Sequence, residues 1–575
     1  MKHLTKVAAT TVALAGSLSI LLAGCGTSGS TSSAGNNTTS SAGTPVNGGT
    51  LTLAQGTKYD DQFIPDMDAS LYTMNITQMA FDPLLNIDNK MNFVPDLVQS
   101  YSWSNDKKTL TMTLDPKANW TDGQPVTSAD VLFTMNYLAS KVYNTTLQGQ
   151  YGYLVGPVKG SSKIMNGTAT SFAQTGGFTQ VNDKTFELHF DKPDAAVLYA
   201  DIASIQPVPS HILKDIPIAQ WQTSSFNKMP TVTDGAYKFT QVNGQDNVQM
   251  TANANYFRGN PHITNLVIKT VTPDVLPGEL ANGDVQMNID SGAIKPQDVS
   301  KLKQIPGLTV KPIVDNGFSY LGLKLYKPEF QNVKVRQAIE YALNRPQMIQ
   351  GIMKGYATPV SGPLPPVSWA YATPQDGMNL YNYNPTQANQ LLDEAGWKKG
   401  ANGMRIDPST GQEANLHLSY SSGNPTTQAE AVAIQQYLQA VGLKVTLDSP
   451  MDFNTLAQKV ETNDKSIQMW LMAWSLSVDP DPRGLWDSTD AMNFERWKDP
   501  HNDQLIADTW GAKAFDQSYR KQAFINWQLY VNQQMPLNFL WARDDIYAYS
   551  NKLHIPANDW SSAGVLNPQQ WWLQQ

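Results

Sequence analysis

The chain has 575 residues, too many for one hydrophobic core, so we expect roughly two to four domains. Its formal net charge of −8 and the lack of any basic stripe argue against a nucleic-acid partner. The single cysteine excludes disulfides within the chain and cysteine-based metal sites.

The N-terminus predicts a targeting segment. Lys2 and Lys6 precede an apolar stretch over 7–23, which is followed by Cys25 in the sequence Leu-Ala-Gly-Cys. This pattern resembles a bacterial lipoprotein signal peptide, which implies cleavage after residues 1–24 and lipidation of the Cys25 thiol. The alternative is an ordinary secretory leader or an N-terminal membrane helix with an incidental cysteine.

Residues 25–48 are nearly all Gly, Ser, Thr, Asn and Ala. Such a segment buries too little apolar surface to order itself, so we expect a flexible tether. The alternation that begins at Gly49 predicts the first strand of the folded body, over 49–54.

A strand and a capped helix are predicted further along. Residues 110–114 alternate between apolar and polar, as in a half-buried strand. Thr127 and Asp130 form a capping box before a helix whose mainly apolar face carries Val131, Thr134, Met135 and Leu138. The whole string over 120–135 closely resembles the signature of the solute-binding proteins of peptide and nickel ABC importers.

The resemblance recurs in order along the chain, in segments 235–239, 253–261, 335–349, 383–397 and 469–486. Within these, Pro346 is placed to open a helix, and Asn384 is placed as an N-cap before Pro385. The chain is therefore identified as a member of extracellular solute-binding protein family 5, the oligopeptide-, dipeptide- and nickel-binding receptors.

The resemblance implies an α/β, two-lobed fold of the periplasmic-binding-protein type, with an extra domain inserted in the first lobe and hinge closure on a ligand. By likeness, the first lobe would comprise residues 49–90, 206–320 and 541–575. The inserted domain would span 91–205 and the second lobe 321–540.

The stretch 466–486 joins an apolar run to an acidic loop. The run 469–474 predicts a strand buried on both faces, and Asp479 and Asp481, each followed by proline, come soon after it. Because each proline restricts the residue before it, the two carboxylates would be held at the strand's end, where α/β sheets bind ligands. The alternative is that the prolines only end the strand and the aspartates are solvated turn residues.

In peptide binders of this family the ligand adds as a strand after the buried strand. Carried over, this assigns main-chain pairing to Ala473, Trp474, Ser475, Leu476 and Ser477. Many relatives place an aspartate three residues after the tryptophan to receive the peptide's ammonium. Ser477 stands there in this chain and carries no charge, so Asp479 or Asp481 is the substitute that the resemblance suggests.

Two other regions are candidates for the ligand cleft. Tyr59 and Asp60 follow the first strand; the alternative is a polar strand-end loop. Trp486, Asn493 and Trp497 resemble the family's segment that closes the second lobe's side of the pocket; the alternative for each tryptophan is core or interface packing.

Catalytic and metal motifs are missing from the sequence. The seven histidines include no pair at metal-ligand spacing, and neither a P-loop nor a nucleophile elbow occurs. We therefore expect no enzyme activity, no metal and no cofactor. The expected protein is a lipid-anchored, monomeric receptor outside the cytoplasmic membrane that delivers oligopeptides to ABC permease subunits. An oligosaccharide receptor of the same fold and a lipoprotein peptide sensor are the alternatives.

Overall fold

The computed structural model describes residues 44–67, 70–290 and 292–574. The predicted signal peptide, Cys25 and almost all of the predicted tether therefore lie outside the described residues. From Pro45 onward the chain forms one compact unit. Within the described ranges, no helix is long and apolar enough to cross a membrane.

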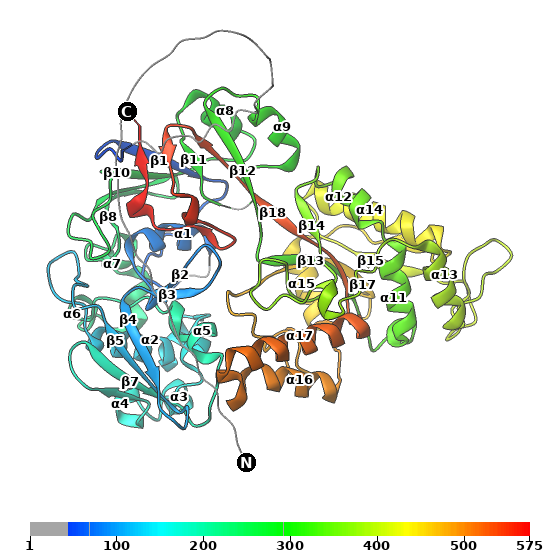
Figure 1. Cartoon of the computed structure of the whole chain (residues 1–575), viewed down its shortest axis with the longest axis horizontal. Coiled ribbons are helices and arrows are strands. Elements are labelled where there is room, and N and C mark those ends of the chain that lie inside the picture. Colours follow the sequence, from blue (N-terminus) through cyan, green and yellow to red (C-terminus); the bar gives the residue numbers. More distant parts are fainter. Residues whose placement is uncertain (1–43, 68–69, 291, 575) are drawn as a thin grey trace, which may run out of the picture. The chain divides into compact units, whose positions relative to one another are not determined.

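One mixed sheet runs through the molecule in the order β16-β15-β17-β13-β18-β11-β1-β10-β9-β8, and β12 and β14 also pair with β18. Its strands are β1 (Thr50–Gln55), β8 (Tyr237–Asn243), β9 (Asn247–Ala252), β10 (Asn265–Thr270), β11 (Met287–Asn288), β12 (Leu308–Val314), β13 (Gly317–Leu323), β14 (Ala357–Pro359), β15 (Leu416–Ser419), β16 (Val445–Leu447), β17 (Met469–Ser475) and β18 (Asn538–Ser550). Figure 1 draws β18 as one long strand that accompanies β12 at one end and β13 at the other.

The buried apolar residues fall into separate cores, and the two ends of β18 contribute to different ones. The first lobe, defined here by the cores around β1 and β8 to β11, buries residues such as Leu53, Phe81 and Ile546. The second lobe, defined by the cores around β13, β15 and β17, buries residues such as Leu321 and Trp527. Since β12, β13 and β18 link the two lobes, these strands are where relative motion would be absorbed.

Helices cover both lobes (Figure 1). Those packed in the first lobe are α1 (Leu71–Ala80), α6 (Ser210–Leu213), α7 (Ser225–Lys228), α8 (Leu276–Asn282) and α9 (Val299–Leu302). Those of the second lobe are α10 (Pro328–Gln331), α11 (Val333–Ala342), α12 (Arg345–Gly351), α13 (Pro385–Glu394), α14 (Pro425–Ala440), α15 (Phe453–Glu461), α16 (Pro500–Trp510) and α17 (Gln517–Gln534). Three two-stranded sheets pair β2 (Leu85–Ile87) with β3 (Phe93–Pro95), β19 (Leu553–His554) with β22 (Trp572–Leu573), and β20 (Trp560–Ser561) with β21 (Gly564–Val565).

A second, antiparallel sheet lies within the segment predicted as an inserted domain. Its order is β4-β5-β7-β6, from β4 (Val98–Trp103), β5 (Thr109–Leu114), β6 (Phe178–Gln180) and β7 (Thr185–His189), with helices α2 (Ser128–Ala139), α3 (Ser161–Met165), α4 (Phe172–Thr175) and α5 (Val197–Ala200). Most of the buried apolar side chains of this segment belong to the same continuous core as Leu53 and Phe81. Its boundaries as a domain stay a prediction.

Local signals in the sequence are confirmed here. β5 alternates between buried and half-buried side chains, and the capping box of Thr127 and Asp130 opens α2. Pro346 lies in the first turn of α12. The Asn384 side chain accepts a hydrogen bond from the Gln387 N–H at the start of α13. Short-range hydrogen bonds and fixed proline dihedrals determine these positions without help from distant residues.

The prediction for the apolar run 469–474 is wrong in its second half. Met469, Trp470 and Leu471 are buried, but from Met472 onward the residues alternate between half-buried and exposed. The reason is that β15 accompanies β17 only at Met469 and Trp470, so the rest of the strand has a neighbour on one side alone.

Candidate functional site

Strand β17 has an open edge. On one side it pairs with β13 along its whole length, in antiparallel register from Met469 opposite Leu323 to Ser475 opposite Gly317. On the other side β15 pairs only with Met469 and Trp470. Among the described residues, no strand covers β17 beyond that point on this side. An uncovered edge of this kind exposes main-chain groups that an extended chain can pair with.

The alternation of hydrogen-bond directions along β17 shows which residues direct their main-chain groups to the open edge. Just past the end of β17, the Leu476 N–H donates to the Asn316 carbonyl oxygen (2.8 Å), on the β13 side. Because successive residues of a strand direct their N–H and C=O groups to opposite edges, the even-numbered residues of β17 face β13. Ala473 and Ser475 therefore direct theirs to the open edge, and both residues are exposed.

Trp474 does not direct its main-chain groups to the open edge. Its main-chain groups face β13, and its half-buried ring stacks on Tyr320 with ring centroids 6.2 Å apart and approaches Phe494 at 5.4 Å. The structure therefore places the Trp474 side chain in the packing of the second lobe.

The loop after β17 is held by its own hydrogen bonds. The Asn316 Nδ2 donates to the carbonyl oxygens of Leu476 and Ser477, at 3.0 Å each. The Ser477 hydroxyl donates to the Asp479 carbonyl oxygen (2.6 Å). Ser477 is exposed, so these hydrogen bonds fix the conformation of a loop that solvent can reach.

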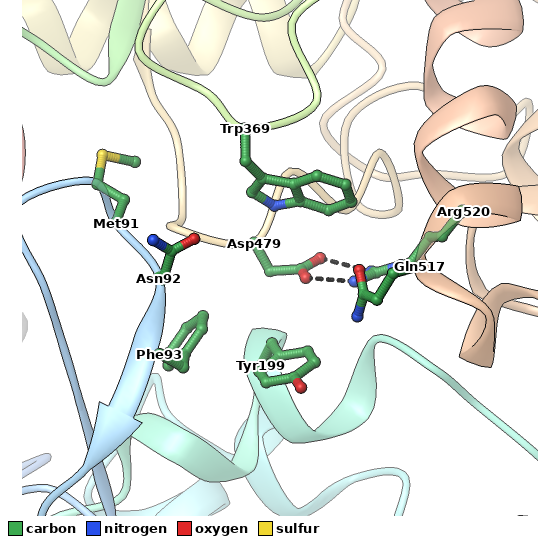
Figure 2. A pocket seen from close by; sticks show the side chains of 8 residues that line it. All are labelled: Met91, Asn92, Phe93, Tyr199, Trp369, Asp479, Gln517 and Arg520. Carbon is green, nitrogen blue, oxygen red and sulfur yellow. Dashed lines mark hydrogen bonds and ion pairs between the residues drawn. The ribbon is translucent and has the colours of Figure 1, made fainter. Parts of the chain in front are cut away.

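Asp479 is buried in an ion pair. Its two carboxylate oxygens accept hydrogen bonds from Nη1 and Nη2 of Arg520 at 2.7 and 2.8 Å, and the carboxylate side chain is 2% exposed. Figure 2 shows this pair between Trp369 and Tyr199, at one side of a cavity of about 240 Å³. Burial raises the pKa of Asp479, and the adjacent Arg520 opposes that rise.

Asp481 is also paired. The Arg483 Nε donates to both of its carboxylate oxygens (3.0 and 2.8 Å), and the Arg483 Nη1 donates to Asp194 Oδ2 (2.7 Å). Arg483 thus joins the second-lobe loop to the segment that carries β4 to β7. The alternative of solvated turn aspartates is wrong for Asp479, which is buried against its arginine partner. Asp481 is half-buried and therefore keeps some contact with solvent.

A larger cavity of about 450 Å³ lies beside the loop. Leu476, Ser477 and Val478 line it from the second lobe. The remaining lining comes from elements packed in the first lobe's core, with apolar side chains from α1 and the hydroxyl-bearing rings of Tyr151, Tyr153, Tyr199 and Tyr256. A mainly apolar cavity with a few polar groups, beside an open strand edge, has the character of a ligand site.

One wall of this cavity is acidic. Asp82, 5% exposed, lines it near Arg258, whose Nη1 donates to Asp96 Oδ2 (2.8 Å). The N–H of Asp82 donates to Asp234 Oδ1 (3.2 Å). Burial raises the pKa of Asp82 to about 6, against the opposing effects of Arg258 and the Tyr256 hydroxyl. Burial also raises the pKa values of Asp96 and Asp234 well above their usual range.

The predicted residues after β1 make contacts within the first lobe. Tyr59 is fully buried, packs against Phe63 with ring centroids 5.7 Å apart, and donates its hydroxyl to the Gly244 carbonyl oxygen (2.6 Å). Asp60 is exposed, and its N–H donates to Thr73 Oγ1 (3.0 Å). Neither residue contributes to the lining of the two cavities.

The three predicted residues of the closing segment are buried in the second lobe. The Trp486 ring packs edge-on against Trp527 at 5.9 Å, and the Trp497 ring stacks on Tyr530 at 6.2 Å. The Asn493 Nδ2 donates to the Trp497 carbonyl oxygen (2.7 Å). All three shape the lobe, and none lines either cavity in this structure.

Sequence reasoning missed Arg520, Asp82 and the tyrosines of the cavity. Arg520 lies 41 residues from Asp479 along the chain, and no local pattern marks its partner. In the described ranges, no group of three or more His, Cys, Asp or Glu side chains is arranged to hold a metal. That neither metal nor cofactor is needed stays a prediction.

Two lobes with separate cores, joined by crossing strands and with a strand edge open beside a cavity, define the class of two-lobed periplasmic binding proteins. Solved structures of this class share the fold. CtaP, an ABC transporter substrate-binding protein of Listeria monocytogenes, superposes with a TM-score of 0.77 at 21% identity, over 92% of this chain and 100% of that one. The Bacillus subtilis oligopeptide-binding protein AppA, solved with a nonapeptide, gives a TM-score of 0.70 at 22% identity, over 92% and 100%.

Within this class, residues 92–496 match the model of the bacterial extracellular solute-binding proteins, family 5, and the chain belongs to that family. The sequence of B. subtilis AppA is 26% identical over 574 residues, covering 97% of each chain. The oligopeptide-binding protein OppA of Lactococcus lactis subsp. lactis is 24% identical, over 87% of this chain and 86% of its own. The family resemblance found in the sequence is therefore confirmed.

Proposed function

We propose that this protein is the substrate-binding receptor of an ABC importer and that its solute is an oligopeptide. The observation that carries the proposal is the open edge of β17, where Ala473 and Ser475 direct main-chain groups away from β13 beside a 450 Å³ cavity. A peptide added to this edge would bind through its backbone, so its sequence would matter little. The names of the relatives AppA and OppA support the same solute class.

The proposed cycle uses the two lobes. The peptide first pairs with the open edge of β17, and its side chains enter the cavity lined by Leu476 to Val478. Movement at the strands that link the lobes then encloses it, and the closed form is recognised by the permease subunits. The ATP hydrolysis that drives uptake belongs to a separate subunit.

The N-terminal features complete the proposal. Lipidation of Cys25 and the tether of residues 25–48 would hold the body at the outer face of the cytoplasmic membrane, since two or more acyl chains give stable anchoring. The test is Cys25→Ser, which is expected to move the protein from the membrane fraction to the soluble fraction. If the variant distributes between the fractions as the wild type does, the lipid anchor is contradicted, whereas the proposal that the solute is a peptide is unaffected.

The experiment that tests the solute is native mass spectrometry of the full chain, purified without denaturation. A ladder of co-purifying peptides of mixed sequence is expected. Ligands spaced by hexose masses would instead support the oligosaccharide alternative, with the cavity tyrosines as stacking platforms. If no peptide co-purifies and calorimetry detects no binding of synthetic hexapeptides, the peptide proposal fails.

Transport and sensing are separated in cells. We expect deletion of the gene to abolish uptake of a labelled peptide that the purified protein binds. Unchanged uptake together with a lost transcriptional response to the peptide would favour the sensor.

A further inference from the structure

A buried acidic cluster, which reaches the larger cavity through Asp82, has more carboxylates than cations. Asp82, Asp96 and Asp234 are each at most 5% exposed and interact with one another, and one arginine, Arg258, interacts with Asp82 and Asp96. The guanidinium is already engaged, since it donates to Asp96 and, at 2.5 Å, to the Asn567 side-chain oxygen. Even with Arg258 counted, ionisation of all three acids would leave an excess of two negative charges.

Several of these oxygens lack a hydrogen-bond partner. In the described ranges, Oδ2 of Asp82, Oδ1 of Asp96 and Oδ2 of Asp234 are buried and have no hydrogen-bond partner at normal geometry, although the Tyr256 hydroxyl lies near enough to Asp82 to lower its pKa. Asp82 is the one of the three that lines the cavity. An unpaired buried carboxylate is costly, and an entering cation that pairs with it removes that cost.

A second carboxylate lines the same cavity. Asp66 is half-buried, and its Oδ2 has no partner among the described residues. Its position is held by its carbonyl oxygen, which accepts the Tyr143 hydroxyl at 2.6 Å. Asp66, Asp82 and Arg258 are the charged residues of the lining, so the cavity presents no lysine and no unpaired arginine to a ligand.

The described second-lobe loop that lines this cavity offers no unpaired carboxylate to a ligand. Ser477 is uncharged, Asp479 is held by Arg520, and Asp481 is held by Arg483. Any carboxylate that meets a cationic group in this cavity must therefore come from the first-lobe wall.

We propose that Asp82, together with Asp66, forms a cation-receiving subsite and that the preferred ligands are peptides carrying a positive charge. The inference rests on the peptide-receptor function proposed above and names its substrate class. The charge could be the N-terminal ammonium or a lysine or arginine side chain, since each of these groups carries one positive charge and only hydrogen-bond donors.

Four synthetic hexapeptides separate these sources. The neutral probe alternates alanine and serine and has an acetylated N-terminus and an amidated C-terminus. The second probe has a free N-terminus, the third has one central lysine in the acetylated peptide, and the fourth has glutamine in place of that lysine. The wild-type chain is expected to bind the second or the third probe about tenfold or more tighter than its neutral counterpart, as measured by calorimetry. Which probe gains identifies the source of the charge.

Matched variants locate the subsite. Asp82→Asn and Asp66→Asn keep the side-chain size and remove the charge, and we expect each to reduce the preference and the double variant to abolish it. Asp215→Asn makes the same charge change at an exposed residue outside the lining and should keep the preference. Thermal unfolding of each variant verifies that it is folded.

Two results would overturn the inference. Equal wild-type affinity for charged and neutral probes does so without any variant, and survival of the preference in the double variant does so for the assigned residues. If none of the four probes binds, it is the peptide-receptor function that fails. The two proposals are therefore distinguishable.

Discussion

A proline scan of two adjacent positions tests the open edge of β17. Ser475 directs its N–H away from β13, whereas the Leu476 N–H donates to the Asn316 carbonyl oxygen at 2.8 Å. Proline removes the N–H and is tolerated in a strand only where that N–H faces an unpaired edge. The two substitutions therefore make the same chemical change on opposite sides of one strand.

The expected effects are opposite. Ser475→Pro removes one main-chain hydrogen bond to the ligand, worth about 0.5–1.5 kcal/mol, so the dissociation constant should rise about two- to twelvefold. Its unfolding free energy should change by less than about 1 kcal/mol, because no intramolecular bond is lost. Leu476→Pro breaks a bond within the fold and should lower the unfolding free energy by about 1–3 kcal/mol.

The assays are calorimetry with a neutral hexapeptide and guanidinium unfolding of both variants. The reasoning is refuted if Ser475→Pro binds the peptide as the wild type does, or if it is destabilised as much as Leu476→Pro. The first result would move the ligand away from this edge. The second would mean that the Ser475 N–H is used inside the protein.

Three further predictions concern the second lobe and the strands that link the lobes. Asp479→Asn leaves the buried Arg520 without its counter-ion, so chemical denaturation should show a loss of about 3–5 kcal/mol, and a loss below about 1 kcal/mol would contradict the ion pair. Burial raises the pKa of Glu430 to about 8, so the folded state takes up a proton between about pH 4.5 and 8 and loses stability as the pH rises through that window, by at most about 1.4 kcal/mol per pH unit. Glu430→Gln should flatten this part of the pH profile of thermal unfolding, and an unchanged slope would argue against the buried carboxyl. Gly322→Ala would place a Cβ 2.1 Å from the buried indole of Trp470, and unfolding measurements should show a cost of about 1–3 kcal/mol, whereas a neutral effect would refute that packing.

Features that depend on near neighbours could be predicted from the sequence alone. The caps of α2 and α13 and the proline in the first turn of α12 lie where predicted, because each depends on residues within one helical turn. The alternation of β5 also matches, since a strand's faces follow from its own pattern. Family membership followed from several such local strings in a consistent order.

Which of the predicted site residues face a cavity depends on long-range packing, which the sequence pattern does not reveal. Asp479 was expected at the end of a strand, but whether it is free depends on Arg520, which a different helix brings to it. The Trp486 ring is buried within the second lobe because Trp527 of α17 packs against it. The open half of β17 and the unpaired oxygen of Asp82 both result from which distant segments do or do not reach them. These contacts result from long-range packing, which an apolar run or a single aspartate in the sequence does not predict.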